Sequence, residues 1–157
     1  MARLYGRAPV GERCVSSIPH GHWNSSTFLA ALRHDRVTAP LLVDGAMDGS
    51  MFLGYVEQSL CRELSPGDIV ICDNLSCHKV KGVRQAIERC GAQIIYLPPY
   101  SPDLNPIELF FSKLKAELRQ ASARTLDALQ QATANALDTF TPEHCANFFR
   151  HAQYATN

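Results

Sequence analysis

The sequence lacks any long apolar run and any recognisable targeting segment. No stretch of its 157 residues reaches the roughly 18 consecutive apolar positions that a membrane-spanning helix requires. The first seven residues, Met-Ala-Arg-Leu-Tyr-Gly-Arg, contain no apolar signal core, which predicts a cytoplasmic protein. Internal repeats and low-complexity tracts are also missing, so a single domain over residues 1–157 is expected.

The sequence also has no excess of positive or negative charge. The 15 basic and 15 acidic residues give a formal net charge of zero, which by itself argues against a nucleic-acid partner. The distribution is uneven, because residues 1–40 carry five Arg against two acids and residues 71–124 carry eight Lys or Arg against five acids. These two basic blocks could contact phosphates, although an ordinary solvated surface explains them equally well.

Cysteine pairs at zinc-finger spacing are not found either. The six cysteines are irregularly spaced and most have apolar neighbours, which predicts buried free thiols in a reducing compartment. Cys72, Cys77 and His78 could be imagined as zinc ligands, but no second ligand pair follows at the required spacing.

What the sequence does contain is the alternation of elements typical of an α/β domain. Its first part predicts antiparallel hairpins with strands over residues 13–19, 26–32 and 41–43, and then a helix over residues 50–60.

The middle of the chain predicts a strand–helix–strand unit. Residues 68–72 and 93–97 are short apolar runs typical of buried strands, and residues 79–89 between them have helical periodicity. Such a unit forms a parallel pair with a right-handed crossover. The last part is helical, with helices that begin at Asn105-Pro106, Thr125 and Thr141-Pro142.

Two acids stand where this arrangement would place a ligand site. Asp73 directly follows the strand predicted over residues 68–72, and open α/β sheets bind ligands at the carboxyl ends of their strands. Glu108 comes 35 positions later (108 − 73), on the first turn of a helix. Structural roles also explain both, since Asp73 would turn the chain and Glu108 would complete a capping box with Asn105.

The connection that leads to Glu108 is unusually stiff. Residues 98–106 contain four prolines, which restrict the backbone to extended conformations. Such a segment is suited to placing Glu108 against Asp73. Asp48 and Asp103 are predicted to be turn residues.

These residues carry a specific resemblance. The sequence is similar to the DDE/D transposases of bacterial insertion sequences, related to the mariner superfamily, in Val70–Asn74 and in Tyr100–Glu108. The string Ser-Pro-Asp-Leu-Asn-Pro-Ile-Glu that ends at Glu108 is the most specific part. The likeness extends to residues 3–9, 20–23, 44–45 and 78–79, and so covers nearly the whole chain.

The resemblance implies a ribonuclease-H-like mixed sheet flanked by helices. It implies an endonuclease and transposase in which three carboxylates hold two Mg²⁺ ions, with Mn²⁺ as a substitute, for attack on DNA phosphodiesters. By match, Asp73 is the second acid and Glu108 the third. The implied partners are transposon-end and target DNA and further copies of the chain, in a dimer or higher assembly that acts on bacterial DNA.

One departure from the family concerns the first acid. In the family it lies on a central first strand, upstream of the segment that matches residues 3–6, so we expect that strand, its Asp and the helix-turn-helix DNA-binding domain to be missing here. The isolated chain is then expected to be poorly stable or inactive. Asp44 is rejected as a substitute, because it should follow an antiparallel strand that ends at the opposite edge of the sheet.

The missing acid leaves alternatives open. A non-catalytic transposase remnant that binds DNA or full-length transposase is the main one, and a ribonuclease-H-like nuclease unrelated to transposition is weaker. The candidate DNA contacts are His78, Lys79, Lys81, Arg84, Lys113 and Lys115. A helix cap explains His78 as well, and ordinary solvation explains each Lys and Arg. Trp23 is interpreted as turn packing.

Overall fold

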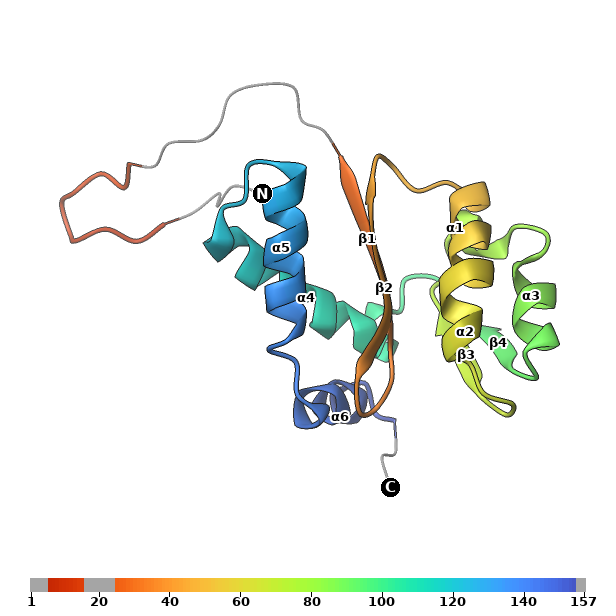
Figure 1. The fold of residues 1–157 in the computed structure, drawn as a ribbon. Coiled ribbons are helices and arrows are strands. Elements are labelled where there is room, and N and C mark those ends of the chain that lie inside the picture. Colours follow the sequence, from red (N-terminus) through yellow and green to blue (C-terminus); the bar gives the residue numbers. More distant parts are fainter. Residues whose placement is uncertain (1–5, 16–24, 155–157) are drawn as a thin grey trace.

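The computed structural model describes residues 6–15 and 25–154 (Figure 1). Its strands and helices alternate as expected for a mixed α/β fold. In chain order they are β1 (Ser26–Leu32), β2 (Val37–Asp44), α1 (Gly49–Tyr55), the π-helical η1 (Val56–Leu60), α2 (Cys61–Glu63), β3 (Ile69–Cys72), the 3-10 helix η2 (Ser76–Lys79), α3 (Val83–Arg89), β4 (Gln93–Tyr96), the 3-10 helix η3 (Pro102–Leu104), α4 (Pro106–Ala121), α5 (Leu126–Leu137) and α6 (Pro142–His151).

The first two strands form the predicted antiparallel hairpin. Its register runs from Ser26 opposite Asp44 to Leu32 opposite Val37, so β2 is longer than the predicted residues 41–43. The register shifts where Ala39 adopts a positive φ of 48°. Ala39 precedes Pro40, and this irregularity hid the first half of β2 from an alternation-based prediction. Residues 13–15 form no strand, and the rest of the strand predicted over 13–19, like Trp23, lies outside the described residues.

The second pair of strands confirms the predicted parallel unit. β3 and β4 are in register from Ile69 opposite Gln93 to Cys72 opposite Tyr96, with α3 between them in the chain. The helix predicted from residue 79 begins only at Val83. Gly82 has a φ of 107°, which no residue within an α-helix adopts, so the preceding residues 76–79 form the separate 3-10 turn η2.

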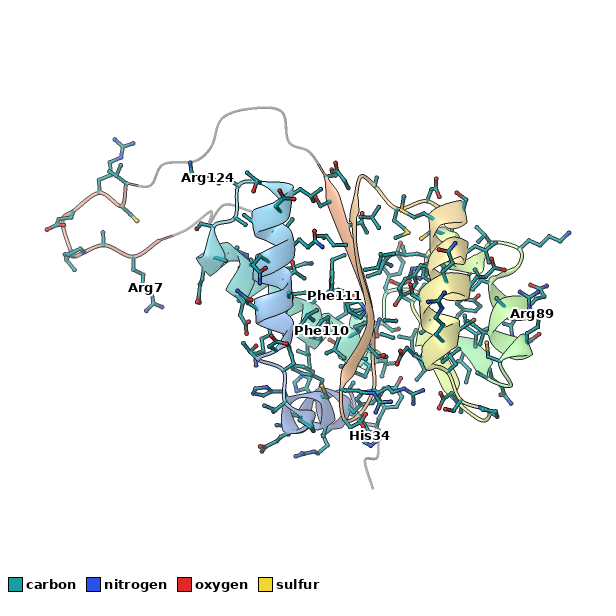
Figure 2. All side chains as sticks on the ribbon, viewed as in Figure 1. Arg7, His34, Arg89, Phe110, Phe111 and Arg124 are labelled. Carbon is teal, nitrogen blue, oxygen red and sulfur yellow. The ribbon has the colours of Figure 1, made fainter. Side chains whose placement is uncertain are left out.

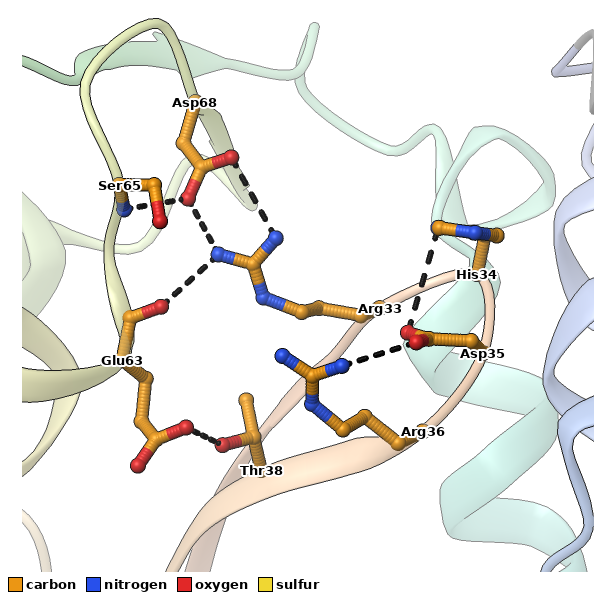
Figure 3. Close-up of polar contacts among 8 residues, drawn as sticks. All are labelled: Arg33, His34, Asp35, Arg36, Thr38, Glu63, Ser65 and Asp68. Carbon is orange, nitrogen blue, oxygen red and sulfur yellow. Dashed lines mark hydrogen bonds and ion pairs between the residues drawn. The ribbon is translucent and has the colours of Figure 1, made fainter.

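Among the described residues, the four strands form two separate two-stranded sheets, β1–β2 and β3–β4. The turn of the hairpin is attached to the start of β3 (Figure 3). Arg33 forms an ion pair with Asp68 and donates a hydrogen bond of 2.9 Å to the carbonyl of Glu63. The hydroxyl of Thr38 donates to the Glu63 carboxylate at 2.5 Å. The end of β1 therefore lies beside the start of β3, and the two strands run antiparallel.

The Arg33–Asp68 pair also determines the protonation of its members. The hydrogen bond from Arg33, with a second one of 2.8 Å from the backbone N–H of Ser65, lowers the pKa of the Asp68 carboxyl. The same bond raises the pKa of the Arg33 guanidinium. Both groups are therefore held in their charged forms, which favours the docked position of the hairpin.

Two apolar cores hold the helices. One joins the face of α1 and η1 that carries Phe52 and Val56 to α3 and β4. The other is built around Phe110 on α4, which is fully buried and packs on Phe28 of β1 and Phe140 at ring-centroid distances of 6.4 and 4.8 Å. Figure 2 labels Phe110 and Phe111 between α4 and the hairpin. The hairpin thus contributes one face to each core.

The helix starts confirm two predicted caps and correct a third. The hydroxyl of Thr125 accepts from the N–H of Ala128 at 3.1 Å, and that of Thr141 accepts from the N–H of His144 at 3.2 Å. Asn105 occupies the N-cap position of α4, but its side chain makes no capping hydrogen bond. The capping box predicted between Asn105 and Glu108 is therefore not formed, and the carboxylate of Glu108 is left free of that role.

The burial of the cysteines agrees only in part with the prediction from sequence. All six cysteines are free thiols, but only Cys145 is buried, while Cys14 is exposed and the other four are half-buried. The prediction of buried thiols is therefore wrong for all but Cys145, whereas the prediction that the cysteines are free thiols is confirmed. In the part of the chain that the structure describes, no helix is long and apolar enough to cross a membrane.

Candidate functional site

A cavity of about 580 Å³ lies between the two sheets, and both predicted acids line it. Its walls come from β1, from α1 and η1, from β3 and the residues that follow it, from the start of α4 and from residues near the C-terminal end. Asp73 enters it from the carboxyl end of β3, and Glu108 from the first turn of α4. The structure thus brings together two acids that are 35 positions apart in the chain.

Asp73 is held by its immediate neighbours. Its Oδ1 atom accepts a hydrogen bond of 3.1 Å from the backbone N–H of Leu75 and lies 2.7 Å from Nδ1 of His78. The side chain is 38% exposed, which leaves its second oxygen free to bind a ligand in the cavity. The buried strand β3 fixes the backbone on one side, and η2 fixes the histidine on the other.

His78 is itself held in place. Its ring packs on Phe52 at a centroid distance of 4.3 Å, and its backbone carbonyl accepts a hydrogen bond of 3.0 Å from the hydroxyl of Tyr96. The imidazole also lines the cavity and is only 17% exposed. A DNA contact through this ring is less accessible than the sequence suggested, whereas a contact with Asp73 is formed.

Glu108 is placed by buried backbone rather than by its own contacts. Asn105 and Pro106 are buried, and the backbone N–H of Glu108 donates to the carbonyl of Asn105 at 3.1 Å. The proline-rich connection before them carries Tyr100 at a φ of 57°, a conformation that non-glycine residues seldom adopt. The Glu108 side chain is exposed and projects from a rigid helical turn.

The cavity does not collect a full set of metal ligands. Within residues 6–15 and 25–154, no group of three His, Cys, Asp or Glu side chains is arranged to hold a metal ion. Two carboxylates that line one cavity are of the oxygen-ligand type that Mg²⁺ prefers. The residues present therefore fit a divalent cation only as a partial site.

Asp44 does not line the cavity, but the reason predicted from sequence for rejecting it was wrong. Because β1 runs antiparallel to β3, its hairpin partner β2 runs parallel to β3, so Asp44 lies at the same end of the molecule as Asp73 and not at the opposite one. It remains apart from the site because β2 is the strand farther from β3, and Asp44 does not line the cavity.

The basic residues predicted to contact DNA lie in three different environments: beside Tyr96, on the surface, and beside the second core. Lys79 and Arg84 flank Tyr96, with Nζ and Cζ at 5.6 and 5.8 Å from its ring centroid, and Arg84 also reaches Glu88 at 3.7 Å. Lys81 and Lys115 are exposed.

Lys113 is half-buried and lies beside the second core. Its Nζ lies 4.8 Å from the ring centroid of Phe140 and 3.1 Å from Nδ1 of His144. The sequence could not show this, because the partners are 27 and 31 residues further along (140 − 113 and 144 − 113).

Comparison with known proteins agrees with this architecture. A family model described as DDE superfamily endonuclease matches residues 1–130. Among curated proteins, no sequence matches.

Solved structures of Mos1 transposase share the fold. The pre-cleavage Mos1 transpososome superposes with a TM-score of 0.73 at 13% identity, covering 98% of this chain and 47% of that one. The Mos1 paired-end complex with Mn gives 0.71 at 14% identity and covers 94% and 46%. The catalytic domain of Mos1 mariner transposase gives 0.66 at 14% identity and covers 83% and 74%. This chain thus spans about half the length of the Mos1 chains in the two complexes.

Proposed function

The chain belongs to the DDE superfamily of endonucleases, and on this premise we propose that it serves as the catalytic domain of a transposase that cleaves DNA phosphodiesters with divalent metal ions. One observation supports the proposal above all others. Asp73 and Glu108, which we match to two acids of the family's motif by sequence resemblance, line the same cavity. The substrates we propose are transposon-end and target DNA; one solved Mos1 structure is a paired-end complex with the left transposon end.

The metal would be Mg²⁺, with Mn²⁺ as a substitute, as the Mn present in one of the Mos1 complexes suggests. Asp73 and Glu108 would supply oxygen ligands, and His78 would orient the Asp73 carboxylate. A divalent ion bound there supplies a Lewis acid that lowers the pKa of bound water and stabilises charge on a phosphoryl oxygen. The chain's own contribution is to hold the two carboxylates on a strand end and a helical first turn.

Contacts with the DNA backbone are proposed for the basic side chains near this edge. Lys79, Lys81 and Arg84 follow Asp73 in the chain within eleven positions (84 − 73), and Lys115 lies on the exposed side of α4. Lys113 contributes little to this surface, because it is engaged with Phe140 and His144. His78 acts through Asp73 and not as a phosphate contact.

A plasmid-nicking assay tests this function. The 157-residue protein is incubated with supercoiled DNA and Mn²⁺ at high protein concentration, because two acids alone would give a low rate. The proposal predicts nicked circles that are lost in Asp73→Asn and in Glu108→Gln but retained in Asp103→Asn, a matched carboxylate in the connection before α4. Nicking that survives Asp73→Asn would remove this acid from the reaction.

A second candidate is a non-catalytic module that binds DNA or a complete transposase. The observation in its favour is that the described residues form no three-ligand metal cluster. Retarded migration of DNA with this protein, with no nicking at any metal concentration and no effect of Asp73→Asn, would favour this candidate over the enzyme.

A further inference from the structure

Two cysteine thiols from different helices meet at one carbonyl oxygen. The Sγ atoms of Cys61 and Cys90 lie 3.6 and 3.4 Å from the backbone oxygen of Ala86, and both thiols donate to it. The two thiols also share a hydrogen bond with each other. Because the sulfurs have a common acceptor and a direct contact, they form a dithiol pair and not two isolated cysteines.

The way α3 ends explains why this carbonyl is available. Cys90 is the C-cap of α3, and its backbone N–H donates at 3.0 Å to the carbonyl of Ile87, three residues back. In a continuing α-helix this N–H would donate to Ala86, four residues back. The Ala86 carbonyl accepts from the two thiols instead, which are weak donors. The last turn of α3 therefore brings both sulfurs to the same place.

The packing of the first core places Cys61. This residue begins α2 directly after the buried Leu60 at the end of η1, and it packs against the core cluster that includes Ile87 of α3. α2 and α3 lie on the same side of the hairpin (Figure 1). The meeting of the two thiols is thus a consequence of core packing between helices.

A small reagent can reach the pair. Both cysteines are half-buried. Arg89, next to Cys90, forms an ion pair of 3.2 Å with Glu57, and these two side chains are 71% and 48% exposed. Figure 2 labels Arg89 at α3, on the side of the molecule remote from the hairpin. The dithiol pair therefore lies close to solvent and outside the cavity that Asp73 lines.

The surroundings make the two thiols unequal. Burial, and after it the hydrogen bond with Cys90, raises the pKa of the Cys61 thiol to about 11, while the Arg89 guanidinium acts in the opposite direction. Cys61 therefore keeps its proton near neutral pH. Since the thiolate is the nucleophile in thiol–disulfide exchange, we expect Cys90 to react first and Cys61 to react second.

We propose that Cys61 and Cys90 form a redox site that a low-molecular-weight disulfide of the glutathione type converts to an intramolecular disulfide. The Cys90 thiolate attacks one sulfur of the reagent, forms a mixed disulfide and releases a first thiolate. Cys61 then loses its proton, attacks the sulfur of Cys90 and releases a second thiolate. The two cysteines give up two protons and two electrons, and the reagent takes them up as two thiols.

The new bond would close a loop from residue 61 to residue 90. This segment contains β3, η2 and α3, and with them Asp73 and His78. A disulfide stabilises a fold mainly by restricting the unfolded chain, so oxidation should make this segment harder to unfold. The inference is independent of the proposed DNA chemistry, because neither a metal ion nor DNA takes part in it.

Two other roles for the pair are less well supported. The thiols could serve only as small apolar side chains in the core, but the direct contact between them exceeds what packing requires. A metal site would need further ligands, and the described ranges 6–15 and 25–154 place no third His, Cys, Asp or Glu with the pair. A bond between the two sulfurs needs no additional group.

Oxidation of the 157-residue protein with glutathione disulfide at pH 8, followed by mass-spectrometric mapping of unreduced peptides, tests the proposal. We expect the Cys61–Cys90 link to form at least about tenfold faster than any other link between two cysteines of the chain. The thermal midpoint of the oxidised protein should exceed that of the reduced protein by about 10 °C. Cys61→Ser and Cys90→Ser should each lose both effects, whereas Cys77→Ser, at another half-buried thiol, should retain them.

The outcomes separate a redox site from simple packing. A Cys61–Cys90 link that is the main product and raises the midpoint supports the proposal. Glutathione adducts that persist on these cysteines without a link would show that the sulfurs are not placed to bond. Equal rates of linking in the folded protein and in urea would show that the fold does not bring them together, and a link that leaves the midpoint unchanged or lowers it would show no stabilising role. Each of these three results overturns the proposal, and the mapping of the wild type does not depend on any variant that fails to fold.

Discussion

Nδ1 of His78 lies 2.7 Å from Oδ1 of Asp73, and the same imidazole packs on Phe52 at a centroid distance of 4.3 Å. The ring thus links the apolar face of α1 to the carboxylate at the end of β3. A carboxylate positioned by a second side chain is better prepared to bind a cation than a mobile one, because less conformational freedom is lost on binding. This relationship leads to the first prediction.

Replacement of His78 should weaken metal binding without removing a ligand. His78→Gln is expected to lower the affinity for Mn²⁺ by about tenfold, the range typical of residues that orient a ligand. Titration of the protein with Mn²⁺, followed by electron paramagnetic resonance, measures the change. His144→Gln on α6 is the matched control. Equal affinities of wild type and His78→Gln would show that the contact with Asp73 has no positioning role.

The Arg33–Asp68 pair should make stability depend on pH in the acid range. Its pairing lowers the pKa of the Asp68 carboxyl below the ordinary value of 3.8, so the folded state binds this proton less tightly than the unfolded state. The stabilisation is therefore fully present above pH 3.8 and is lost as pH falls through the lowered pKa. Asp68→Asn should cost about 1 kcal/mol near neutral pH and progressively less toward pH 3.

Urea denaturation of the two proteins at several pH values measures this difference. Asp127→Asn, which removes an acid at the start of α5, is the control. A difference between wild type and Asp68→Asn that stays constant down to pH 3 would contradict the role assigned to the pair.

The second core should depend strongly on Phe110. This side chain is fully buried against Phe28 and Phe140, so Phe110→Ala is expected to cost about 3 to 5 kcal/mol, the range for large aromatic truncations. Thermal or urea unfolding measures the loss. Leu126→Ala, at a site that is 44% exposed, should cost far less. Similar losses for the two variants would mean that the core is not centred on Phe110.

The thiols should differ in reactivity. Cys14 is exposed, whereas Cys145 is buried, and desolvation raises the pKa of its thiol. Burial, together with the negative charge of Asp73, raises the pKa of Cys72 to about 12, so its thiolate is scarce at pH 8. Labelling with a chromogenic disulfide at pH 8 and peptide mapping should therefore find Cys14 modified first. Fast modification of Cys72 or Cys145 in the folded protein would contradict these assignments.

Much of this architecture could be predicted from local patterns. The apolar runs at β3 and β4 and the caps at Thr125 and Thr141 are local features, and each produced a correct element. The sequence also predicted that Asp73 and Glu108 would lie near each other, because parallel strands end at the same edge of a sheet. β3 and β4 are parallel, and both acids line the same cavity. The family match covers residues 1–130, which include both acids.

The rest depends on contacts that no local pattern contains. The Arg33–Asp68 pair joins residues 35 positions apart, and Lys113 meets its partners on another helix. The positive φ of Ala39 has no glycine to signal it. The orientation of β2 was misjudged because strand direction across two separate sheets is set by their docking, which the sequence of the hairpin alone does not determine.

The most direct test of the central claim, that Asp73 and Glu108 share one divalent ion, is a double-mutant cycle of Mn²⁺ binding. Wild type, Asp73→Asn, Glu108→Gln and the double variant are titrated with Mn²⁺ under identical conditions, with Asp103→Asn as the control. The account predicts that each single variant loses about tenfold or more in affinity and that the double variant loses less than the product of the two, because both act on one site. Losses that multiply independently, or single variants that bind as wild type does, would contradict it.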